Sequence, residues 1–297
     1  MHQIQWFPGH MRKSLRLLEE AAGKADVVIE MAEARAPEAS RNPLIEEIIR
    51  SKKKPRLLLL AKADLADPEI TNRWLKWYRE RGTPALTLES PRPGEAGRVA
   101  AAAKGAVSFV RGGGAPIRRL KVLIAGIPNV GKSTLLNLLA GRVKAKTGNT
   151  PGLTRELQTL RVEKKGAGTG TFTQAGELLL FDTPGVLWPR FEDPAAALRL
   201  AWLGAIKDSI LPLEETARGA AAFLMEAHPQ ALNQRYRISI PDFPEGGPSP
   251  DGLVEEIGRR RGCLVKGGGV DGQKAAGVLI QDLRSGRLGR ISFESPP

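Results

Sequence analysis

The segment at residues 126–134, GIPNVGKST, constrains the fold of this chain more than any other. It matches the phosphate-binding loop pattern G-x-x-x-x-G-K-[ST]. The apolar residues 120–125 before it predict a buried strand, and residues 134–140 after it predict a helix. In this arrangement the loop amides and the helix N-terminus point positive charge at a bound anion. We therefore expect Lys132 to reach the β- and γ-phosphates of a nucleotide, and the Ser133 hydroxyl to hold Mg²⁺.

Strand-like and helix-like segments alternate before and after this loop. The alternation predicts a doubly wound, mostly parallel sheet of six strands. Strands are expected at residues 25–30, 56–61, 84–88, 120–125 and 178–181, and helices at residues 13–22, 43–51, 68–80 and 95–110. Ligands of such sheets bind at the carboxyl ends of the strands, so functional residues are expected directly after each strand.

Polar residues and a glycine do follow these strands. Lys62 and Asp64 come after one strand, and Asp182 and Gly185 come at the end of another. Asp64 can accept hydrogen bonds from both N1–H and N2–H of guanine, which adenine does not offer. We expect Asp182 to bind Mg²⁺ through water and the Gly185 amide to meet the γ-phosphate. Thr154, which follows the loop helix, would complete the magnesium shell.

The order of these motifs is rotated relative to ordinary Ras-like GTPases, because the guanine motif at residues 61–64 precedes the phosphate-binding loop. This order resembles that of the circularly permuted GTPases. The five motifs follow one another at residues 61–64, 88–90, 126–134, 151–154 and 182–185. The opening residues 6–11, WFPGHM, narrow the resemblance to the ribosome biogenesis GTPase A family, also called YlqF. The resemblance extends over about residues 1–240, and five motif matches in one order make it specific.

The resemblance implies a circularly permuted Ras-like P-loop GTPase domain. It implies that the residues contacting GTP or GDP are Lys62, Asp64, Glu89, Ser90, Asn129, Val130, Gly131, Lys132, Ser133, Thr134 and Gly185. It places the catalytic roles on His10, Lys132 and Thr154. Mg²⁺ would be held by Ser133, Thr154 and Asp182, and K⁺ would be held partly by Asn129.

One residue departs from the family pattern, and another differs from the Ras-like enzymes. Ala61 stands where the guanine motif begins with Asn, so a hydrogen bond to the base is lost, at a cost of about 1–3 kcal/mol if buried. Val186 stands where Ras-like enzymes carry the Gln that orients the attacking water. His10 would orient that water or accept its proton. The alternative is that His10 packs beside Trp6 and Phe7 and contributes shape only.

Charge and composition indicate the class of binding partner and the cellular compartment. The 297 residues carry a formal net charge of +13, and the sequence pI is about 10.1. We favour RNA over an anionic membrane as the partner, because no amphipathic basic helix or lipidation signal is present. No signal peptide and no membrane-spanning apolar run is found, and Cys263 is the only cysteine. We therefore expect a cytoplasmic monomer in a reducing compartment.

Two domains are expected. The GTPase domain would span residues 1–188, with the N-terminal segment 1–24 included, and a mainly helical domain would span residues 189–297. Helical spacing of Ala and Leu or other apolar residues recurs at residues 195–203, 213–227, 253–261 and 271–282. Candidate contacts to rRNA phosphates in this domain are Arg259, Arg260, Arg261, Lys266, Lys274, Arg284, Arg287 and Arg290. The alternative for each single residue is a solvated helical face.

The predicted function is a GTPase in late assembly of the large (50S) ribosomal subunit. It would bind rRNA and the large subunit or its precursor, hydrolyse GTP slowly alone and faster on the particle, and be released on hydrolysis. An alternative is a GTP-dependent RNA-binding module with incidental hydrolysis, which Ala61 and Val186 keep open. A third interpretation is a GTPase with the same site that acts on tRNA or in signalling, and residues 6–11 argue against it.

Overall fold

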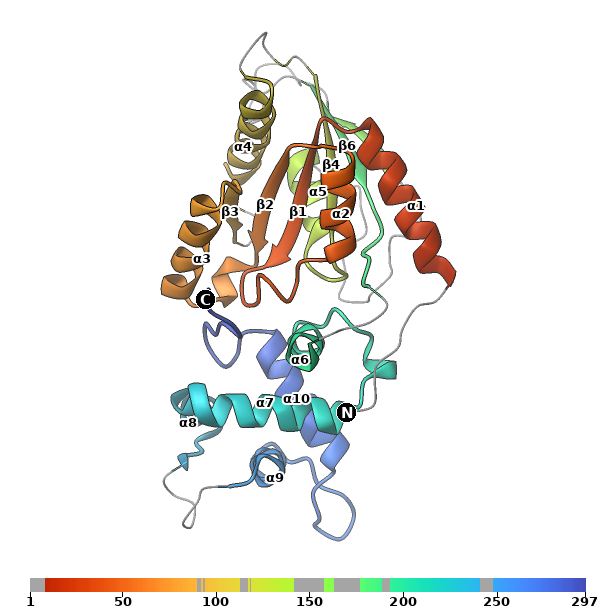
Figure 1. Cartoon of the computed structure of the whole chain (residues 1–297). Coiled ribbons are helices and arrows are strands. Elements are labelled where there is room, and N and C mark those ends of the chain that lie inside the picture. The colour runs from red at the N-terminus through yellow and green to blue at the C-terminus, as the bar shows by residue number, and fades with distance from the viewer. Residues whose placement is uncertain are drawn as a thin grey trace. The chain divides into compact units, whose positions relative to one another are not determined.

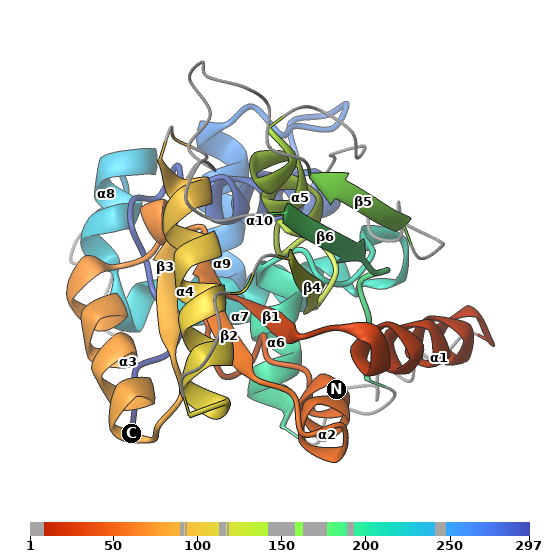
Figure 2. The same cartoon turned by 90° about the horizontal axis from the view of Figure 1, so that it is seen from above.

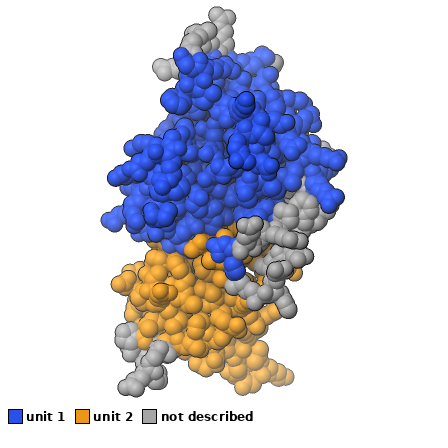
Figure 3. Space-filling model, in the orientation of Figure 1, with its two compact units in different colours: residues 1–194, 292–297 blue, residues 195–291 orange. Residues whose placement is uncertain are grey.

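The computed structural model describes residues 9–89, 92, 94–112, 117, 119–141, 158–162, 177–188, 193–240 and 248–297. The chain forms two compact units (Figure 3). Unit 1 consists of Met1–Pro194 together with Ser292–Pro297, and unit 2 consists of Ala195–Ile291.

Unit 1 is built on one sheet with the strand order β3-β2-β1-β4-β6-β5 (Figure 1; β5 is labelled in Figure 2). Five of its strands are parallel, and β5 at one edge runs antiparallel to β6. The predicted doubly wound, mostly parallel arrangement is therefore confirmed. The strands are β1 (Val27–Glu33), β2 (Arg56–Ala61), β3 (Ala85–Leu88), β4 (Arg119–Gly126), β5 (Gln158–Val162) and β6 (Glu177–Asp182).

The helices of unit 1 cover both faces of this sheet (Figure 2). On one face, α1 and α2 bury Leu18 and Ile45 against β1, β4 and β6, and α3 buries Trp74 and Tyr78 against β1 and β2. On the other face, α4 and α5 contact each other and the central strands. These helices are α1 (Gly9–Lys24), α2 (Pro43–Ser51), α3 (Pro68–Glu80), α4 (Glu95–Val110) and α5 (Lys132–Ala140).

Three helices begin with a capping side chain followed by proline. Asn42, Asp67 and Ser249 each accept a hydrogen bond from an amide of the first turn, and a proline follows each of them. Proline fits this position because its fixed φ is helical and its missing N–H would have no partner there. These signals explain why α2 and α3 begin at the predicted residues. They also explain why α9 begins at Pro250, before the predicted start at residue 253.

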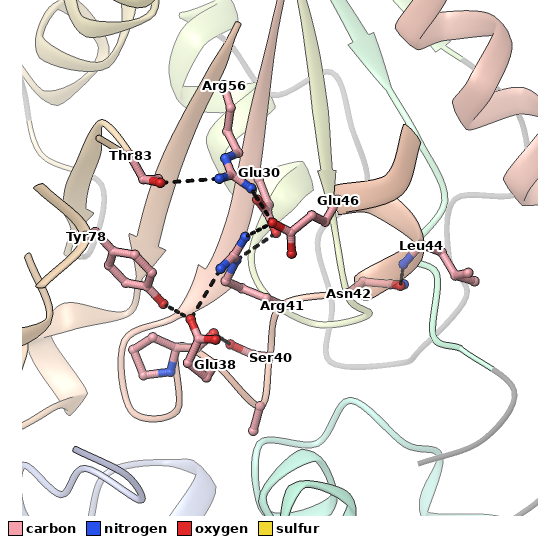
Figure 4. A network of polar contacts seen from close by, with 12 residues as sticks. Glu30, Glu38, Ser40, Arg41, Asn42, Leu44, Glu46, Arg56, Tyr78 and Thr83 are labelled. Carbon is pink, nitrogen blue, oxygen red and sulfur yellow. Dashed lines mark hydrogen bonds and ion pairs between the residues drawn. The ribbon is translucent and has the colours of Figure 1, made fainter. Parts of the chain in front are cut away.

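A buried carboxylate on β1 organises the charged residues between β1, α2 and α3 (Figure 4). Glu30 is fully buried and accepts hydrogen bonds from Arg41 Nε at 3.1 Å and Arg56 Nη1 at 3.3 Å. Arg41 also pairs with Glu38 at 3.3 Å, and the Tyr78 hydroxyl donates to Glu38 at 2.6 Å. This network holds the loop between β1 and α2 against α3.

Unit 2 is helical, as predicted for this part of the chain. Its helices α7, α9 and α10 pack on one another, and α8 packs against α7. Asp282 on α10 is buried and accepts two hydrogen bonds from Arg235, at 2.8 and 3.0 Å, and one from the Tyr236 hydroxyl at 3.0 Å. None of the helices in the described part of the chain is long and apolar enough to cross a bilayer. The helices are α6 (Pro194–Trp202), α7 (Leu213–Ala227), α8 (Pro229–Tyr236), α9 (Pro250–Arg260) and α10 (Gly272–Arg284).

The limits of the second unit differ from the predicted domain at residues 189–297. The unit begins at Ala195 and ends at Ile291, because the last six residues of the chain return to unit 1. Phe293 is buried in unit 1, at 3% exposure, and its amide donates to the carbonyl of Arg35 at 2.6 Å. Helical periodicity could not reveal this return, since its partners lie near the other end of the sequence.

Candidate nucleotide site

The strand ends that carry the predicted residues meet at one edge of the sheet. In the parallel ladders Glu33 lies opposite Ala61, and Met31 lies opposite Gly126. Asp182 lies opposite Ile124 on the other side of β4. The loops after β1, β2, β4 and β6 are therefore neighbours. This edge is where a doubly wound sheet binds its ligand.

The loop after β4 has the shape of a phosphate-binding loop. A Cβ at Gly126 would approach the carbonyl oxygen of Met31 to 2.6 Å, so no larger residue fits beside β1. Asn129 and Gly131 have φ values of +60° and +107°, which turn the chain into α5. Within the described residues, no side chain caps the start of α5. The amides of its first turn therefore remain available to an anion.

Lys132 is folded into the loop that it follows. Its side chain is buried, and Nζ donates to the carbonyls of Gly126 at 3.2 Å and Ile127 at 2.7 Å. Burial lowers the pKa of Lys132 to about 8, against the opposing charge of Asp182. Nucleotide phosphates entering the loop would replace these two carbonyls as partners of the ammonium group.

Asp182, the last residue of β6, is a buried carboxylate whose bonding capacity is unused. It is 1% exposed, and neither of its oxygens has a hydrogen-bond partner in the described part of the chain. Burial raises its pKa, while the charge of Lys132 opposes that rise. A buried carboxylate without partners is costly, and a bound cation would relieve that cost. Its oxygens suit Mg²⁺, which prefers oxygen ligands and keeps several waters.

The segment after β6 packs directly on the phosphate loop. The Thr183 hydroxyl donates to the carbonyl of Ile124 at 2.8 Å, which ties the segment to β4. A Cβ at Gly185 would lie 2.7 Å from both Cα and N of Pro128, and 2.9 Å from Nζ of Lys132. Glycine at this position therefore allows the two loops to touch, with the Gly185 backbone close to the lysine.

Val186 is held through its backbone from two sides. Its amide donates to the carbonyl of Gly126 at 3.4 Å, and its carbonyl accepts from Asn42 Nδ2 at 2.7 Å. The Asn42 side chain also caps α2 by accepting from the Leu44 amide at 2.9 Å. The Val186 side chain is buried and apolar. It offers no group that could orient a water molecule.

Lys62 and Asp64 directly follow β2, at the same edge. Lys62 has a φ of +55°, in the left-handed region that few residues other than glycine adopt. Its Nζ donates to Glu33 Oε2 at 2.7 Å. Asp64 lies in the short helix η1 (Ala63–Leu65), for which Lys62 is the N-terminal flanking residue. The structure thus brings the predicted guanine motif beside the end of β1.

The loop between β1 and α2 supplies residues that the sequence analysis did not select. Its members Arg35, Ser40 and Asn42 are buried, and so is Glu33 before it. Arg35 Nε donates to Glu33 Oε1 at 2.5 Å. Burial acts to raise the pKa of Glu33, but the charges of Arg35 and Lys62 outweigh it, so this pKa lies below its ordinary value. The available signal was a run of polar residues between an apolar strand and an Asn-Pro helix start.

Some predicted site residues cannot be placed. Ser90 and Thr154 lie outside the described residues, and so does the side chain of His10, whose backbone belongs to α1. Glu89 follows β3 and forms an ion pair with Arg92 at 3.2 Å.

The fold and this edge define a P-loop GTPase whose guanine motif precedes its phosphate loop, that is, a circularly permuted one. The family described as 50S ribosome-binding GTPase matches residues 121–233, which begin within β4. Ribosome biogenesis GTPase A of Bacillus cereus is 43% identical over 99% of this chain and 94% of that protein. The protein of the same name from Bacillus licheniformis is 42% identical over 99% of this chain and 98% of its own length.

Solved structures agree with this assignment at the level of the fold. The GDP-bound structure of TM YlqF superposes with a TM-score of 0.61 at 23% identity, over 94% of this chain and 98% of that chain. The chain belongs to the ribosome biogenesis GTPase A family, and it is a GTPase of ribosome biogenesis. The similarity extends over the whole chain, beyond the limit near residue 240 that the motifs suggested.

Proposed function

We propose that this GTPase binds GTP at the edge where β1, β2, β4 and β6 end, and acts late in assembly of the large (50S) ribosomal subunit. The observation that carries the proposal is the convergence there of the phosphate loop, the unpartnered Asp182 and the pair Lys62 and Asp64. The names of the relatives and the description of the matching family support the ribosomal role.

In this proposal the two halves of the site bind different parts of GTP. The phosphates are wrapped by Asn129, Val130, Gly131, Lys132, Ser133 and Thr134. The Gly185 amide meets the γ-phosphate, and the Lys132 ammonium exchanges its loop carbonyls for phosphate oxygens. Asp64 reads the guanine N1–H and N2–H, while Lys62, Glu89 and Ser90 lie beside the base.

Two cations are proposed in the same site. Ser133, Thr154 and Asp182 would hold Mg²⁺, which supplies charge neutralisation on the phosphate oxygens. The buried and unpartnered oxygens of Asp182 support this assignment. Asn129 would contribute to a K⁺ site, where that ion supplies the positive charge given elsewhere by an arginine finger. Asn129, with a φ of +60°, lies in the loop that would surround the phosphates.

The attacking water needs an orienting group, since Val186 is apolar and buried. We propose His10 for this role, because an imidazole can orient water or accept its proton. Because the Val186 side chain cannot orient water, it also supports a second candidate function. That alternative is a GTP-dependent RNA-binding module in which hydrolysis is incidental.

The proposed macromolecular partner of unit 2 is rRNA. Five arginines of the candidate contact set have structural partners within unit 2. Arg260, Arg261 and Arg284 donate to the backbone carbonyls of Arg237, Arg235 and Ala201 at 2.5, 2.9 and 2.8 Å. Arg259 pairs with Glu256 at 3.3 Å, and Arg287 pairs with Asp282 at 3.2 Å. Lys266 and Lys274 are exposed and form no ion pair with another described residue. We therefore place the phosphate contacts first on Lys266 and Lys274. A monomer in the cytoplasm is proposed, and the free thiol of Cys263 is consistent with a reducing compartment.

The decisive experiment measures GTP hydrolysis in potassium buffer, alone and with purified large subunits or their precursors. Small subunits serve as the control particle, and sodium buffer tests the K⁺ site. The proposal predicts a rise with large-subunit particles only. Tight GTP binding with no rise on any particle would favour the binding module.

The same assay tests the proposed residues. His10→Ala should lower the hydrolysis rate and leave GTP binding intact. His228→Ala, the same change in unit 2, should change neither the hydrolysis rate nor GTP binding. Equal rates for the two variants would remove His10 from the mechanism. Asp182→Asn should raise the Mg²⁺ concentration needed for tight GTP binding.

A further inference from the structure

The last six residues of the chain, Ser292–Pro297, are here called the tail. The tail belongs to unit 1 although the residues directly before it, up to Ile291, belong to unit 2. Ser292 and Phe293 are buried at 5% and 3% exposure. A segment that is buried and hydrogen-bonded in this way has a defined position, and its neighbours show what it positions.

One set of tail contacts is made to the loop that follows β1. The Phe293 amide donates to the carbonyl of Arg35 at 2.6 Å, and the Arg35 guanidinium lies over the Phe293 ring, 5.2 Å from its centroid. The Glu294 carboxylate accepts from the amides of Glu38 at 2.5 Å and Ala39 at 3.2 Å. The tail therefore fixes both the backbone of this loop and its one fully buried arginine.

A second set of contacts is made to the start of α3. The Ser292 hydroxyl accepts from the Asp67 amide at 3.2 Å, and Trp74 Nε1 donates to the carbonyl of Glu294 at 3.4 Å. Asp67 caps α3 and lies three residues after Asp64. The tail thus joins the loop after β1 to the segment that carries the guanine motif.

A continuous path of contacts leads from the tail to Lys62. Phe293 packs on Arg35, Arg35 Nε donates to Glu33 Oε1 at 2.5 Å, and Lys62 Nζ donates to Glu33 Oε2 at 2.7 Å. Lys62 has a φ of +55°, a conformation that is maintained only when surrounding contacts enforce it. Arg35 and Glu33 are buried at 2% and 1% exposure, so neither can take a water molecule as an equal substitute.

We propose that Ser292, Phe293 and Glu294 are positioning residues for guanine recognition. They hold the loop after β1 in place beside the guanine motif, which the Ala61 side chain cannot do. An Asn at the place of Ala61 would bond the base and link neighbouring loops, whereas the alanine methyl group can do neither. In this chain the tail, which lies outside the guanine motif, links these neighbouring loops instead. The inference rests on the proposed function, which assigns Lys62 and Asp64 to the guanine base.

The test compares nucleotide binding by full-length variants, with fluorescently labelled GDP and ADP as probes. Phe293→Ala should weaken GDP binding about ten-fold, which is the order of effect of losing an aromatic contact to a buried arginine. Binding of ADP, which engages the phosphate loop but not Asp64, should be unchanged. The ratio of GDP to ADP affinity is therefore the readout, because a general loss of stability would lower both.

Three further variants make the result specific. Phe109→Ala is the matched control, since Phe109 is 84% exposed at the end of α4 in the same unit. It should leave the affinity ratio unchanged. Phe293→Trp keeps an aromatic face for Arg35 and should restore much of the ratio. Phe293→Leu keeps an apolar side chain without that face, and should not.

The outcomes separate this inference from the function on which it rests. If the unaltered protein does not prefer GDP to ADP, the guanine assignment of Lys62 and Asp64 is wrong, and the inference is withdrawn with it. If the unaltered protein prefers GDP and Phe293→Ala keeps the same ratio, only the role of the tail is wrong. Should Phe293→Ala not fold, Glu294→Gln carries the test, with about a three-fold loss of the ratio expected from its weaker acceptor.

Discussion

The side-chain amide of Asn42 donates to the carbonyl of Val186 at 2.7 Å, across 144 positions of sequence. The bond joins the start of α2 to the segment after β6, where Ras-like enzymes carry their catalytic glutamine. The same side chain also accepts from the Leu44 amide. Its Nδ2 therefore bonds Val186, while its Oδ1 caps α2. An aspartate at position 42 would keep the acceptor and lose the donor.

We therefore expect Asn42→Asp to destabilise the protein by about 1–3 kcal/mol, because a buried carbonyl loses its partner and faces a charge. Urea unfolding measures the loss. Asn72→Asp, the same change at an exposed position of α3, should be close to neutral. Asn42→Asp should also alter GTP hydrolysis, since the backbone of Val186 is released. Equal unfolding free energies for the two variants would mean that the bond to Val186 contributes nothing.

Gly185→Ala tests the contact between the segment after β6 and the phosphate loop. The added methyl group would meet the Pro128 backbone at 2.7 Å, and backbone cannot move aside as a flexible side chain can. We expect a loss of about 1–3 kcal/mol in unfolding free energy from overpacking, together with weaker GTP binding. Gly105→Ala in α4 has open space around its Cβ and should be neutral or stabilising by up to about 1 kcal/mol. Thermal unfolding of both variants decides the matter.

Glu30→Gln probes the buried network of Figure 4. Glu30 bonds Arg41 at 3.1 Å and Arg56 at 3.3 Å with a side chain that is 1% exposed. Removing this charge leaves two partly buried guanidinium groups short of a partner, so a loss of about 3 kcal/mol is expected. Glu80→Gln removes an exposed carboxylate that lies 3.9 Å from Lys76 and should cost less than about 1 kcal/mol. Denaturant midpoints for both variants give the comparison.

The carboxylate of Glu33 predicts a pH dependence. Its pKa in the folded protein lies below the ordinary value of 4.5, because Arg35 and Lys62 outweigh the effect of burial. The unfolded chain therefore takes up a proton before the folded one as the pH falls. This part of the stability is complete above pH 4.5 and is lost as the pH falls through the folded pKa. Unfolding free energies measured from pH 7 downward should show the gap between wild type and Glu33→Gln narrowing in acid. A gap that is constant with pH would contradict this assignment.

The elements that position the site were predictable because their signals are local. Residues 57–61 are a run of apolar residues shortly after Pro55, and the pairs Asn42-Pro43 and Asp67-Pro68 indicate where helices begin. The phosphate loop was likewise predictable, since its glycine spacing reflects close approach of backbone to a ligand. The placement of Lys62, Asp64 and Asp182 at one edge follows from strands that run parallel.

The bonding state of the charged residues was not predictable. Lys132 turns its ammonium onto the carbonyls of its own loop, and Arg260 is occupied by a backbone carbonyl although it was expected to face RNA. A sequence gives the charge of each residue but not the groups that surround it. The buried positions of Glu33 and Arg35 were missed for the same reason.

By itself the sequence determined the strands, the helix starts and the order of the nucleotide motifs, because each depends on residues only a few positions apart. Only the tertiary structure decided that Phe293 returns to Arg35, and that Asn42 holds the backbone of Val186. Such pairs join segments that no periodicity or spacing relates. Their geometry is set by how the whole chain closes around the sheet, and burial then makes each bond strong enough to fix the site.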